Sequence, residues 1–342
     1  MFLPDTTRFV LSLSKDGGTL APVVYTAPRE PQTGEERTMK LADWKARGHE
    51  VVCGGHAMFY ADSAPDAHDR PTIFLIHGFP TASWDWHKLW PDLSARFRLV
   101  APDLLGFGYS DKPRRHVYSI HEQADLMEEL IARIGLGSFH VLAHDYGDTV
   151  AQEMLARQNA KPEADRQWLS VCFLNGGLFP ETHRARLIQK LLLGPLGPAI
   201  NALTGRATFD RTFSAVFGPD TRPTATELDA FWTLINEKDG RHVLHKLITY
   251  MRDRREHRQR WVAALADACV PVQIINGSLD PVSGAHMVAR YRELICSDNI
   301  VELPTIGHYP QVEAPAAVLD AYLAFLDRTT AAGPGAAAYT TA

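Results

Sequence analysis

The 342-residue chain has few cysteines, no long apolar run and no large excess of either charge. Its four cysteines stand far apart without a C-x-x-C pair, which excludes a disulfide-stapled scaffold and a cysteine-based zinc site and favours buried, reduced thiols. No segment approaches the roughly 20 consecutive apolar residues that span a bilayer, so we expect no membrane span. The formal net charge of −5 gives no basis for binding nucleic acid or an anionic membrane.

Three motifs that mark cofactor sites are also missing. The chain has no Walker-type phosphate loop, no G-x-G-x-x-G after a first strand and no cluster of metal ligands, so we expect neither a cofactor nor a metal. The first residues, Met-Phe-Leu-Pro, reach Asp5 and Arg8 before any apolar segment, which is not typical of a secretory signal. We therefore expect a cytoplasmic protein whose partners are a small-molecule substrate and water. The oligomeric state does not follow from the sequence.

Strand-like and helical patterns alternate along most of the chain. One helix is well marked, because Ser119 begins a capping box, Ser-Ile-His-Glu, apolar residues then recur at helical spacing, and Gly135 ends the pattern. The strand candidates are short, nearly continuous apolar runs, as expected for strands covered on both faces, at residues 72–76, 98–101, 139–143, 169–174, 272–275 and 300–303. This alternation predicts an α/β fold with a mostly parallel central sheet and helices on both faces.

The alternation is interrupted once. From about Leu178 to Trp261 the sequence shows helical patterns at residues 186–193, 227–235 and 242–260 and no convincing strand, as expected for an inserted helical cap over an active site. We therefore divide the chain into a poorly ordered N-terminal extension (1–45), a core in two parts (46–177 and 262–329), a helical cap between them (178–261) and a tail (330–342).

The most informative segment is FHVLAHDYG, residues 139–147, where an apolar strand runs into a small–x–nucleophile–x–small turn before a helix. This is the pattern of the G-x-S-x-G nucleophile elbow, with Ala143 and Gly147 as the small residues and Asp145 in place of serine. The small residues let the strand and the helix approach closely, and the turn leaves the N–H of Tyr146 free to donate. The alternative for Asp145 alone is an ordinary N-cap of the following helix.

Three further features support the elbow interpretation. The strand at 72–76 ends in His-Gly-Phe79-Pro, and in α/β hydrolases this loop supplies the second oxyanion donor, here the Phe79 N–H. Asp280 follows the strand at 272–275, and His308 follows the strand at 300–303. The nucleophile, the acid and the histidine therefore occur in the order that the α/β-hydrolase fold uses, each beyond the carboxyl end of a strand.

An aspartate nucleophile points to a particular chemistry. A carboxylate is already ionised near pH 7 and can attack an sp3 carbon directly, giving an alkyl ester on Asp145. His308, oriented by Asp280, would then take a proton from the water that hydrolyses this ester, while the N–H groups of Phe79 and Tyr146 hold the oxyanion. Attack on an ordinary ester or amide would give an anhydride, so the sequence favours epoxides or alkyl halides.

From about residue 50 to residue 328, the chain resembles the epoxide hydrolase and haloalkane dehalogenase branch of the α/β-hydrolase superfamily, and the likeness is strongest to the mesoderm-specific transcript protein family. The stretches that carry it are HGFPTASWDW (77–86), LGFGYSDKP (105–113), AHDYGDTVAQE (143–153), NGGLFPETHR (175–184) and HYPQVE (308–313). The resemblance implies an α/β-hydrolase fold with a cap and a hydrolase activity that needs no cofactor.

Leaving-group chemistry separates the two activities of this branch. Dehalogenases that resemble this chain carry halide-binding Asn and Trp side chains where this sequence has Phe79 and Tyr146. The alkoxide formed from an epoxide instead needs a cap residue to donate a proton or a hydrogen bond. Epoxide hydrolases mostly use two cap tyrosines, and residues 148–249 contain no tyrosine. Tyr250 matches the second tyrosine and His183 is the candidate for the first, although either could instead be a packing residue.

Several assignments stay open at this point. Trp84 and Trp86 could wall the substrate pocket or pack in the core, and the basic run at 252–260 is interpreted as a solvated helix face. Epoxide hydrolysis through Asp145 is the favoured function. The alternatives are haloalkane dehalogenation, hydrolysis of another strained electrophile such as a β-lactone, and a catalytically silent protein that only binds. A silent protein would not need a nucleophile, an acid and a histidine together.

Overall fold

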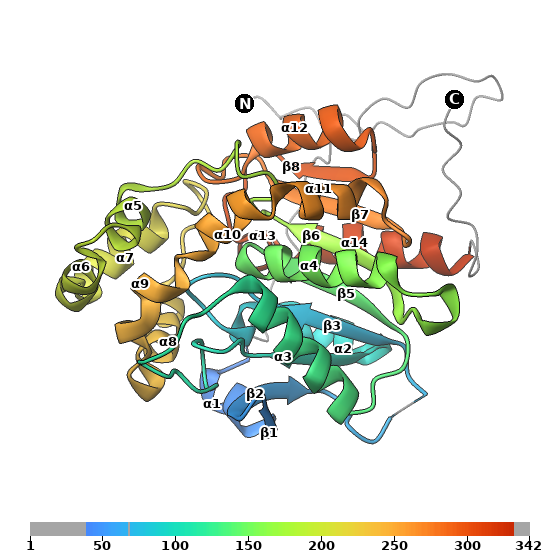
Figure 1. Ribbon diagram of the computed structural model, residues 1–342, viewed down its shortest axis with the longest axis horizontal. Coiled ribbons are helices and arrows are strands. Elements are labelled where there is room, and N and C mark those ends of the chain that lie inside the picture. Colours follow the sequence, from blue (N-terminus) through green and yellow to red (C-terminus); the bar gives the residue numbers. More distant parts are fainter. Residues whose placement is uncertain (1–38, 68, 332–342) are drawn as a thin grey trace, which may run out of the picture.

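In the computed structural model, which describes residues 39–67 and 69–331, eight strands form one sheet (Figure 1). The strands are β1 (Gly48–Cys53), β2 (His56–Asp62), β3 (Thr72–Ile76), β4 (Arg98–Pro102), β5 (Phe139–His144), β6 (Trp168–Leu174), β7 (Val272–Gly277) and β8 (Ile300–Leu303). Their order across the sheet is β1-β2-β4-β3-β5-β6-β7-β8. Strand β2 is antiparallel to β1 and β4, and every other neighbouring pair is parallel. The six predicted strands and the mostly parallel sheet are confirmed.

The strands predicted from the sequence do not include β1 and β2, which form a hairpin. Gly54 and Gly55 connect the two strands with φ angles of 57° and 81°, a conformation that glycine adopts without strain. Most residues of β1 are partly or fully exposed because it lies at the edge of the sheet, so its apolar pattern is weak. The Gly-Gly pair between two runs of strand-forming residues is the signal that predicts such a hairpin.

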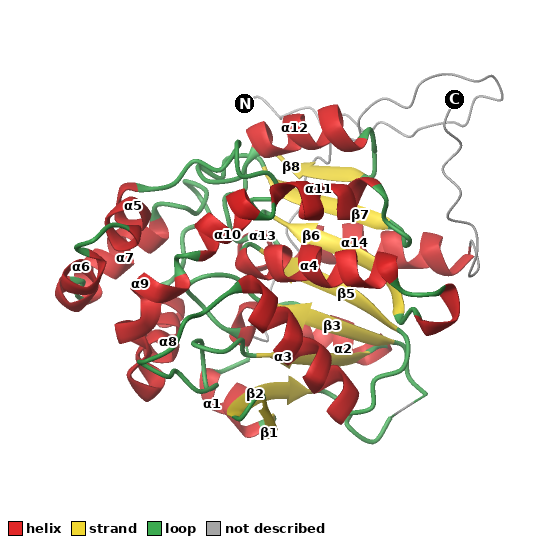
Figure 2. Ribbon diagram, in the orientation of Figure 1, coloured by secondary structure: helices red, strands yellow, loops and turns green. Residues whose placement is uncertain are grey.

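Helices cover both faces of the sheet (Figure 2), as expected. One face carries α3 (Ile120–Arg133), α4 (Tyr146–Ala160), α11 (Arg258–Ala266) and α12 (Ala285–Ile295), whose apolar side chains join one buried cluster. The other face carries α1 (Leu41–Ala46), α2 (Trp90–Arg96) and α14 (Pro315–Ala331), which belong to a second buried cluster. Three short helices, η1 (Ser83–Trp86), η2 (Glu163–Asp165) and α13 (Pro310–Glu313), lie in the connections.

Helix α1 overlaps the segment expected to be poorly ordered, residues 1–45, in all but its last residue. Its Trp44 side chain is fully buried, its indole donates a hydrogen bond to Ser83 Oγ (3.1 Å), and its ring packs edge-on against Trp90 with centroids 4.6 Å apart. The expectation is therefore wrong for residues 41–45, because one large aromatic side chain anchors this helix to the core. Most of the expected extension, residues 1–38, and most of the expected tail, residues 332–342, lie outside the described part of the chain.

The predicted start of α3 is confirmed in part. The Ser119 hydroxyl accepts a hydrogen bond from the Glu122 N–H at 3.2 Å, as an N-cap does. The Glu122 carboxylate, which a capping box would direct to the Ser119 N–H, instead lies 2.8 Å from His116 Nε2. Gly135, with a φ of 64°, follows the last turn and ends the helix as expected.

The segment between β6 and β7, which is described without a gap, contains helices and no strand. Its first helices are α5 (Leu187–Leu193), α6 (Gly197–Leu203), α7 (Arg206–Ser214), α8 (Ala225–Asn236), η3 (Glu237–Val243), α9 (Leu244–Leu247) and α10 (Tyr250–Glu256), and they are called the cap below. Figure 1 shows α5 to α9 grouped at one end of the sheet. The single helix expected at 242–260 is divided among α9, α10 and α11. Across residues 39–67 and 69–331, no helix is both long enough and apolar enough to cross a bilayer.

Candidate active site

A cavity of about 120 Å³ lies between the carboxyl ends of the strands and the cap. On the core side it is lined by Phe79 and Pro80 after β3, Asp145 after β5, and His308 and Tyr309 after β8. The cap contributes mainly apolar side chains, among them Ile188, Leu192, Phe209, Phe213, Val216 and Leu244. A mostly apolar cavity with a few convergent polar groups is the usual form of a small-molecule site.

Asp145 occupies the tip of the turn between β5 and α4. Its φ and ψ are 46° and −102°, a conformation that residues other than glycine rarely adopt, and its side chain is buried. Its N–H donates a hydrogen bond to the Leu174 carbonyl oxygen (3.2 Å). The turn is tight, because a Cβ at Gly147 would lie 2.3 Å from the Ile76 carbonyl oxygen. The backbone therefore has the strained elbow that the small–x–Asp–x–small pattern predicts.

Two backbone N–H groups are available to bind charge on the Asp145 carboxylate. The Phe79 N–H donates to Asp145 Oδ2 at 3.2 Å. Tyr146 is the first residue of α4, so its N–H has no acceptor within the helix. The β3 loop approaches the elbow closely because residue 78 is glycine: a Cβ there would lie 3.0 Å from Asp145 Cβ and 2.6 Å from His144 Nδ1.

His308 and Asp280 form a hydrogen-bonded pair next to the elbow. His308 Nδ1 lies 2.7 Å from Asp280 Oδ2, and His308 Nε2 lies 3.8 Å from Asp145 Oδ2. The Asp280 carboxylate also accepts hydrogen bonds of 2.7–3.1 Å from the side chain of Asn175 and from Val282 and Ser283. The structure therefore brings together the three residues for which the sequence predicts the roles of nucleophile, base and orienting acid.

The electrostatics of the site favour charged forms for all three groups. Burial opposes charge on Asp145, but the nearby His308 and Arg254 outweigh it and lower the pKa of the Asp145 carboxyl below its usual value. Burial opposes charge on Asp280 as well, and His308 is the main group that lowers its pKa. Burial alone would lower the pKa of His308, yet Asp280 and Asp145 together raise it well above the usual imidazole value. The two carboxylates therefore favour the protonated form of His308 before substrate arrives.

Arg254 belongs to the site, although the basic run around it predicts a solvated helix face. That interpretation is wrong for this residue, which is 2% exposed because α10 lies against the elbow. Its guanidinium donates hydrogen bonds to the Asp145 carbonyl oxygen (3.0 Å) and to Thr149 Oγ1 (2.7 Å), and its Nη2 lies 3.6 Å from Asp145 Oδ1. One buried cation therefore holds both the backbone and the carboxylate of the elbow. The interpretation is right for the exposed Arg252 and Arg255.

Tyr250, which is buried, and His183, which is partly buried, both lie beside Arg254. Arg254 donates a hydrogen bond to His183 Nδ1 (3.3 Å), so the proton of the neutral His183 ring is on Nε2. Burial and the neighbouring Arg254 lower the pKa of His183 to about 3, so this ring is neutral at pH 7. The Arg254 guanidinium also lies 4.5 Å from the centre of the Tyr250 ring, which is 6.1 Å from the ring of Phe79 and 5.0 Å from that of Tyr146.

The Tyr250 hydroxyl and His183 Nε2 are both buried, and neither has a hydrogen-bond partner within the described part of the chain. Burial, and to a lesser degree the charge of Asp145, raises the pKa of Tyr250, so its hydroxyl keeps its proton at pH 7. Neither side chain lines the cavity. Two candidate donors therefore lie behind the cavity wall, next to the residues that surround the nucleophile.

Trp84 and Trp86 lie in η1 and do not line the cavity. Trp84 stacks on His87 with ring centroids 3.8 Å apart and donates from Nε1 to the Met39 carbonyl oxygen (3.2 Å), and Trp86 is fully buried. Of the two roles that the sequence leaves open for these residues, the structure supports packing in the core and not contact with substrate, because the turn of η1 directs both rings into the second buried cluster. The aromatic part of the cavity wall comes from Phe209 and Phe213 of α7 instead.

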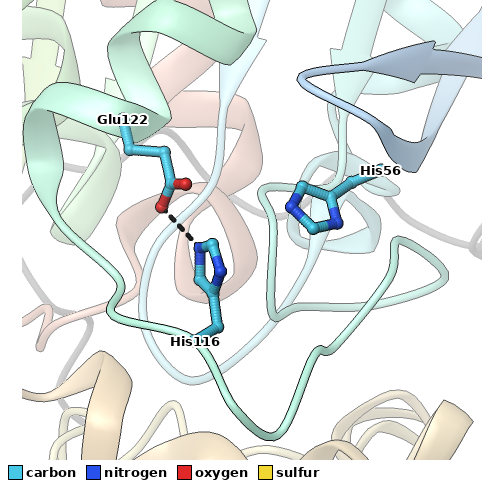
Figure 3. Close-up of side chains that lie close together, drawn as sticks. All are labelled: His56, His116 and Glu122. Atoms are coloured by element: carbon cyan, nitrogen blue, oxygen red, sulfur yellow. Dashed lines mark hydrogen bonds and ion pairs between the residues drawn. The ribbon is translucent and has the colours of Figure 1, made fainter.

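One group of possible metal ligands lies apart from the cavity, although the sequence suggests none. His56 at the start of β2, His116 before α3 and Glu122 in the first turn of α3 each place one ligand atom within 4.8 Å of the others (Figure 3). The three residues come together only through the packing of the hairpin against the loop before α3. Glu122 already pairs with His116, and none of the three lines the cavity, so we assign the group no part in the reaction.

The sheet order, the elbow and the cap define the class of protein. A family model described as the alpha/beta hydrolase fold matches residues 71–164. The crystal structure of haloalkane dehalogenase DbeA from Bradyrhizobium elkani superposes with a TM-score of 0.71 at 22% identity, covering 84% of this chain and 99% of that one. The protein has the α/β-hydrolase fold.

Sequence relatives narrow the class to a family. The mesoderm-specific transcript protein of Mus musculus is 42% identical over 294 residues, which cover 84% of this chain and 88% of that protein. LipZ of Mycobacterium tuberculosis is 42% identical over 261 residues, which cover 75% of this chain and 89% of that protein. The chain belongs to the mesoderm-specific transcript protein family, and the resemblance carried by its motifs is confirmed.

Proposed function

We propose that this hydrolase converts epoxides to vicinal diols through a covalent ester on Asp145. The observation that carries the proposal is the buried Asp145 carboxylate at the tip of the elbow, with the Phe79 N–H on one oxygen and the His308–Asp280 pair beside it. A serine in this place would need His308 as a base before it could attack. An ionised carboxylate attacks carbon without any prior proton transfer.

In the first step, the Asp145 carboxylate attacks one carbon of the epoxide ring, and the bond from that carbon to the ring oxygen breaks. The oxygen leaves as an alkoxide and needs a proton, for which the unpartnered Tyr250 hydroxyl is the proposed donor. His183 assists only as a hydrogen-bond donor through Nε2, because its low pKa leaves no imidazolium at pH 7. Since neither side chain lines the cavity, the proposal requires α10, which carries Tyr250, and the loop before α5, which carries His183, to shift toward the substrate when it binds.

Ester formation prepares His308 for the second step. The ester carries no charge, so one of the two carboxylates that raise the pKa of His308 disappears when Asp145 reacts. The imidazolium then gives up its proton more readily, and this proton restores the one lost by Tyr250. His308 becomes the neutral base that hydrolysis needs, and it does so only after the ester has formed.

In the second step, His308 Nε2 takes a proton from a water molecule that attacks the Asp145 carboxyl carbon. The charge that develops on the carboxyl oxygen is held by the N–H groups of Phe79 and Tyr146. The tetrahedral intermediate then breaks its bond to the substrate oxygen, which takes the proton from His308 and leaves as the diol. Asp145 finally passes the carboxyl proton to His308, which restores the ion pair. The oxygen of the water molecule stays in the Asp145 carboxylate.

The donors around the nucleophile favour an epoxide over an alkyl halide. A departing halide needs N–H donors close to the nucleophile. The Trp84 indole is bonded to Met39 and the Trp86 ring packs in the second buried cluster, whereas the Tyr250 ring packs against those of Phe79 and Tyr146. The side chains of Phe79 and Tyr146 supply no N–H either. A hydroxyl and an imidazole N–H without partners are instead present beside the nucleophile, and these are the groups that an alkoxide leaving group requires.

Trapping of the ester tests the proposal. A His308→Gln variant lacks the base of the second step, so incubation with an epoxide should add the full mass of the epoxide to the peptide that contains Asp145. The double variant with Asp145→Asn is the control and should gain no mass. A panel of terminal, disubstituted and aryl epoxides is compared with a bromoalkane and a β-lactone. Adducts from the bromoalkane alone would reassign the enzyme as a dehalogenase, and no adduct from any compound would favour a protein that only binds.

A further inference from the structure

The outer side of cap helices α5 and α6 exposes four leucines. Leu187 and Leu191 lie four residues apart on α5, and Leu196 and Leu203 lie seven apart at the two ends of α6, so each pair shares one side of its helix. Their exposed fractions are 73%, 41%, 68% and 82%. Figure 1 shows α5 and α6 at the edge of the molecule, away from the sheet. These four side chains are called the leucine face below.

The leucine face is unusual for this protein. The described part of the chain exposes eight large apolar side chains, and four of them are in this short segment. Helix α5 is also apolar on two sides, because Ile188 and Leu192 line the cavity while Leu187 and Leu191 point to the outside. A helix at the surface of a protein in water normally carries polar residues opposite its buried side. Helix α5 therefore presents apolar side chains both to the cavity and to the outside of the molecule.

Positive charge surrounds the leucine face. Residues 182–209 contain no Asp or Glu. Arg184, Arg186 and Lys190 are exposed, and none of them forms an ion pair with another residue that the structure describes. Arg206, in contrast, is paired with Asp210 and Asp229. The whole chain has a net negative charge, which argues against an anionic partner. This surface, in contrast, is positively charged.

We propose that the leucine face docks on the surface of an anionic phospholipid membrane. Leucines beside Lys and Arg are the composition of helices that lie in a membrane interface, where the apolar side chains enter the headgroup boundary and the cations pair with phosphates. Because the other side of α5 lines the cavity, docking brings the cavity next to the lipid. This part of the inference rests on the proposed function and makes an epoxide dissolved in the membrane the substrate class.

A second copy of the chain fits this surface less well. A symmetric dimer through the leucine face would place Arg184 and Lys190 of one copy near the same residues of the other, and like charges in such a contact repel. Anionic lipid supplies both the apolar environment and the opposite charge.

Co-sedimentation with vesicles tests the docking without reference to catalysis. The full-length protein is mixed with vesicles of phosphatidylcholine and with vesicles that also contain phosphatidylglycerol. We expect binding to the anionic vesicles that weakens as salt rises, and little binding to the neutral ones. A variant with Leu196→Ser and Leu203→Ser should bind at least about tenfold more weakly, because two apolar side chains no longer leave water. Leu169→Ser is the control: Leu169 is another exposed leucine (41%), but it lies on β6, at the opposite end from the cap.

Two further arms separate docking from the proposed chemistry. Asp145→Asn should bind the vesicles as the wild type does. Docking can therefore be measured even if the protein does not hydrolyse epoxides. With the active enzyme, the double leucine variant should hydrolyse a long-chain epoxide in anionic vesicles at least about fivefold more slowly and a small water-soluble epoxide at the wild-type rate. Neither Leu196 nor Leu203 lines the cavity, so a loss of both activities would contradict a role confined to docking.

Three results would overturn the inference. The leucine face does not dock on lipid if the wild-type protein fails to bind anionic vesicles. The same conclusion follows if the double leucine variant binds them as strongly as the wild type. A dimer in solution that the double variant dissociates would show that a second copy covers the face, and would also overturn it.

Discussion

Replacing Arg254 by methionine should move the acid limb of ester formation to higher pH. In the folded protein the guanidinium lies 3.6 Å from Asp145 Oδ1 and is almost completely buried. At an effective dielectric constant of about 20, two unit charges at this distance attract by about 5 kcal/mol. At about 1.4 kcal/mol per unit, this corresponds to roughly 3 units in the pKa of the carboxyl. His308 still stabilises the carboxylate in the variant, so we expect an upward shift of about one to three units.

The sign of the effect follows from the first step, which needs Asp145 ionised. Arg254 lowers the pKa of Asp145, so as the pH is lowered the rate of ester formation should begin to fall at a higher pH in Arg254→Met than in the wild type. The assay is the single-turnover rate of epoxide consumption from about pH 7 down to about pH 3. Arg255→Met changes an exposed arginine on the same helix and should leave the profile unchanged. Coincident acid limbs for the wild type and Arg254→Met would refute the reasoning, even if the variant were slower at every pH.

Two further predictions use other buried groups. Tyr250→Phe removes the proposed proton donor and should slow ester formation from an epoxide by well over about tenfold; an unchanged single-turnover rate would remove Tyr250 from the mechanism. Asp148 is fully buried on α4, and burial, together with the charge of Asp145, raises the pKa of its carboxyl well above the usual value. Its contribution to stability is therefore complete below the unfolded-state pKa of about 4 and is lost as the pH rises. Asp148→Asn cannot ionise, so its free energy of unfolding, measured in urea, should exceed that of the wild type by more than about 1 kcal/mol at pH 7 and fall less steeply between about pH 4 and pH 7. A pH dependence as steep as that of the wild type would contradict the assigned pKa direction.

Much of the core and of the candidate site could be predicted because both depend on short-range patterns. Buried parallel strands are continuous apolar runs, and their carboxyl ends meet at one edge of the sheet, so residues that follow such strands come together whatever the length of chain between them. The sequence alone therefore predicts that Asp145, Asp280 and His308 lie near one another. The sequence does not predict the hairpin of β1 and β2, because most residues of the edge strand β1 are partly or fully exposed and only the Gly54–Gly55 pair marks the turn.

The parts that could not be predicted depend on contacts between distant segments. Arg254 lies 109 positions from the Asp145 carbonyl oxygen to which it donates, and its neighbours in the sequence, Arg252 and Arg255, are exposed. Nothing in the local pattern of α10 distinguishes the buried cation from the exposed ones. The sequence could not place the side chains of Trp84 and Trp86 for a related reason. Both residues follow the oxyanion loop closely in the sequence, but the turn of η1 decides that their rings point into the core.

The most direct test of the account is a single turnover in water labelled with oxygen-18, with enzyme in excess over an epoxide. If Asp145 forms the ester and water attacks its carboxyl carbon, the label appears in the Asp145 carboxylate and the diol carries none. Label in the diol with an unlabelled Asp145 would mean that water attacks the epoxide directly, and would contradict the covalent mechanism.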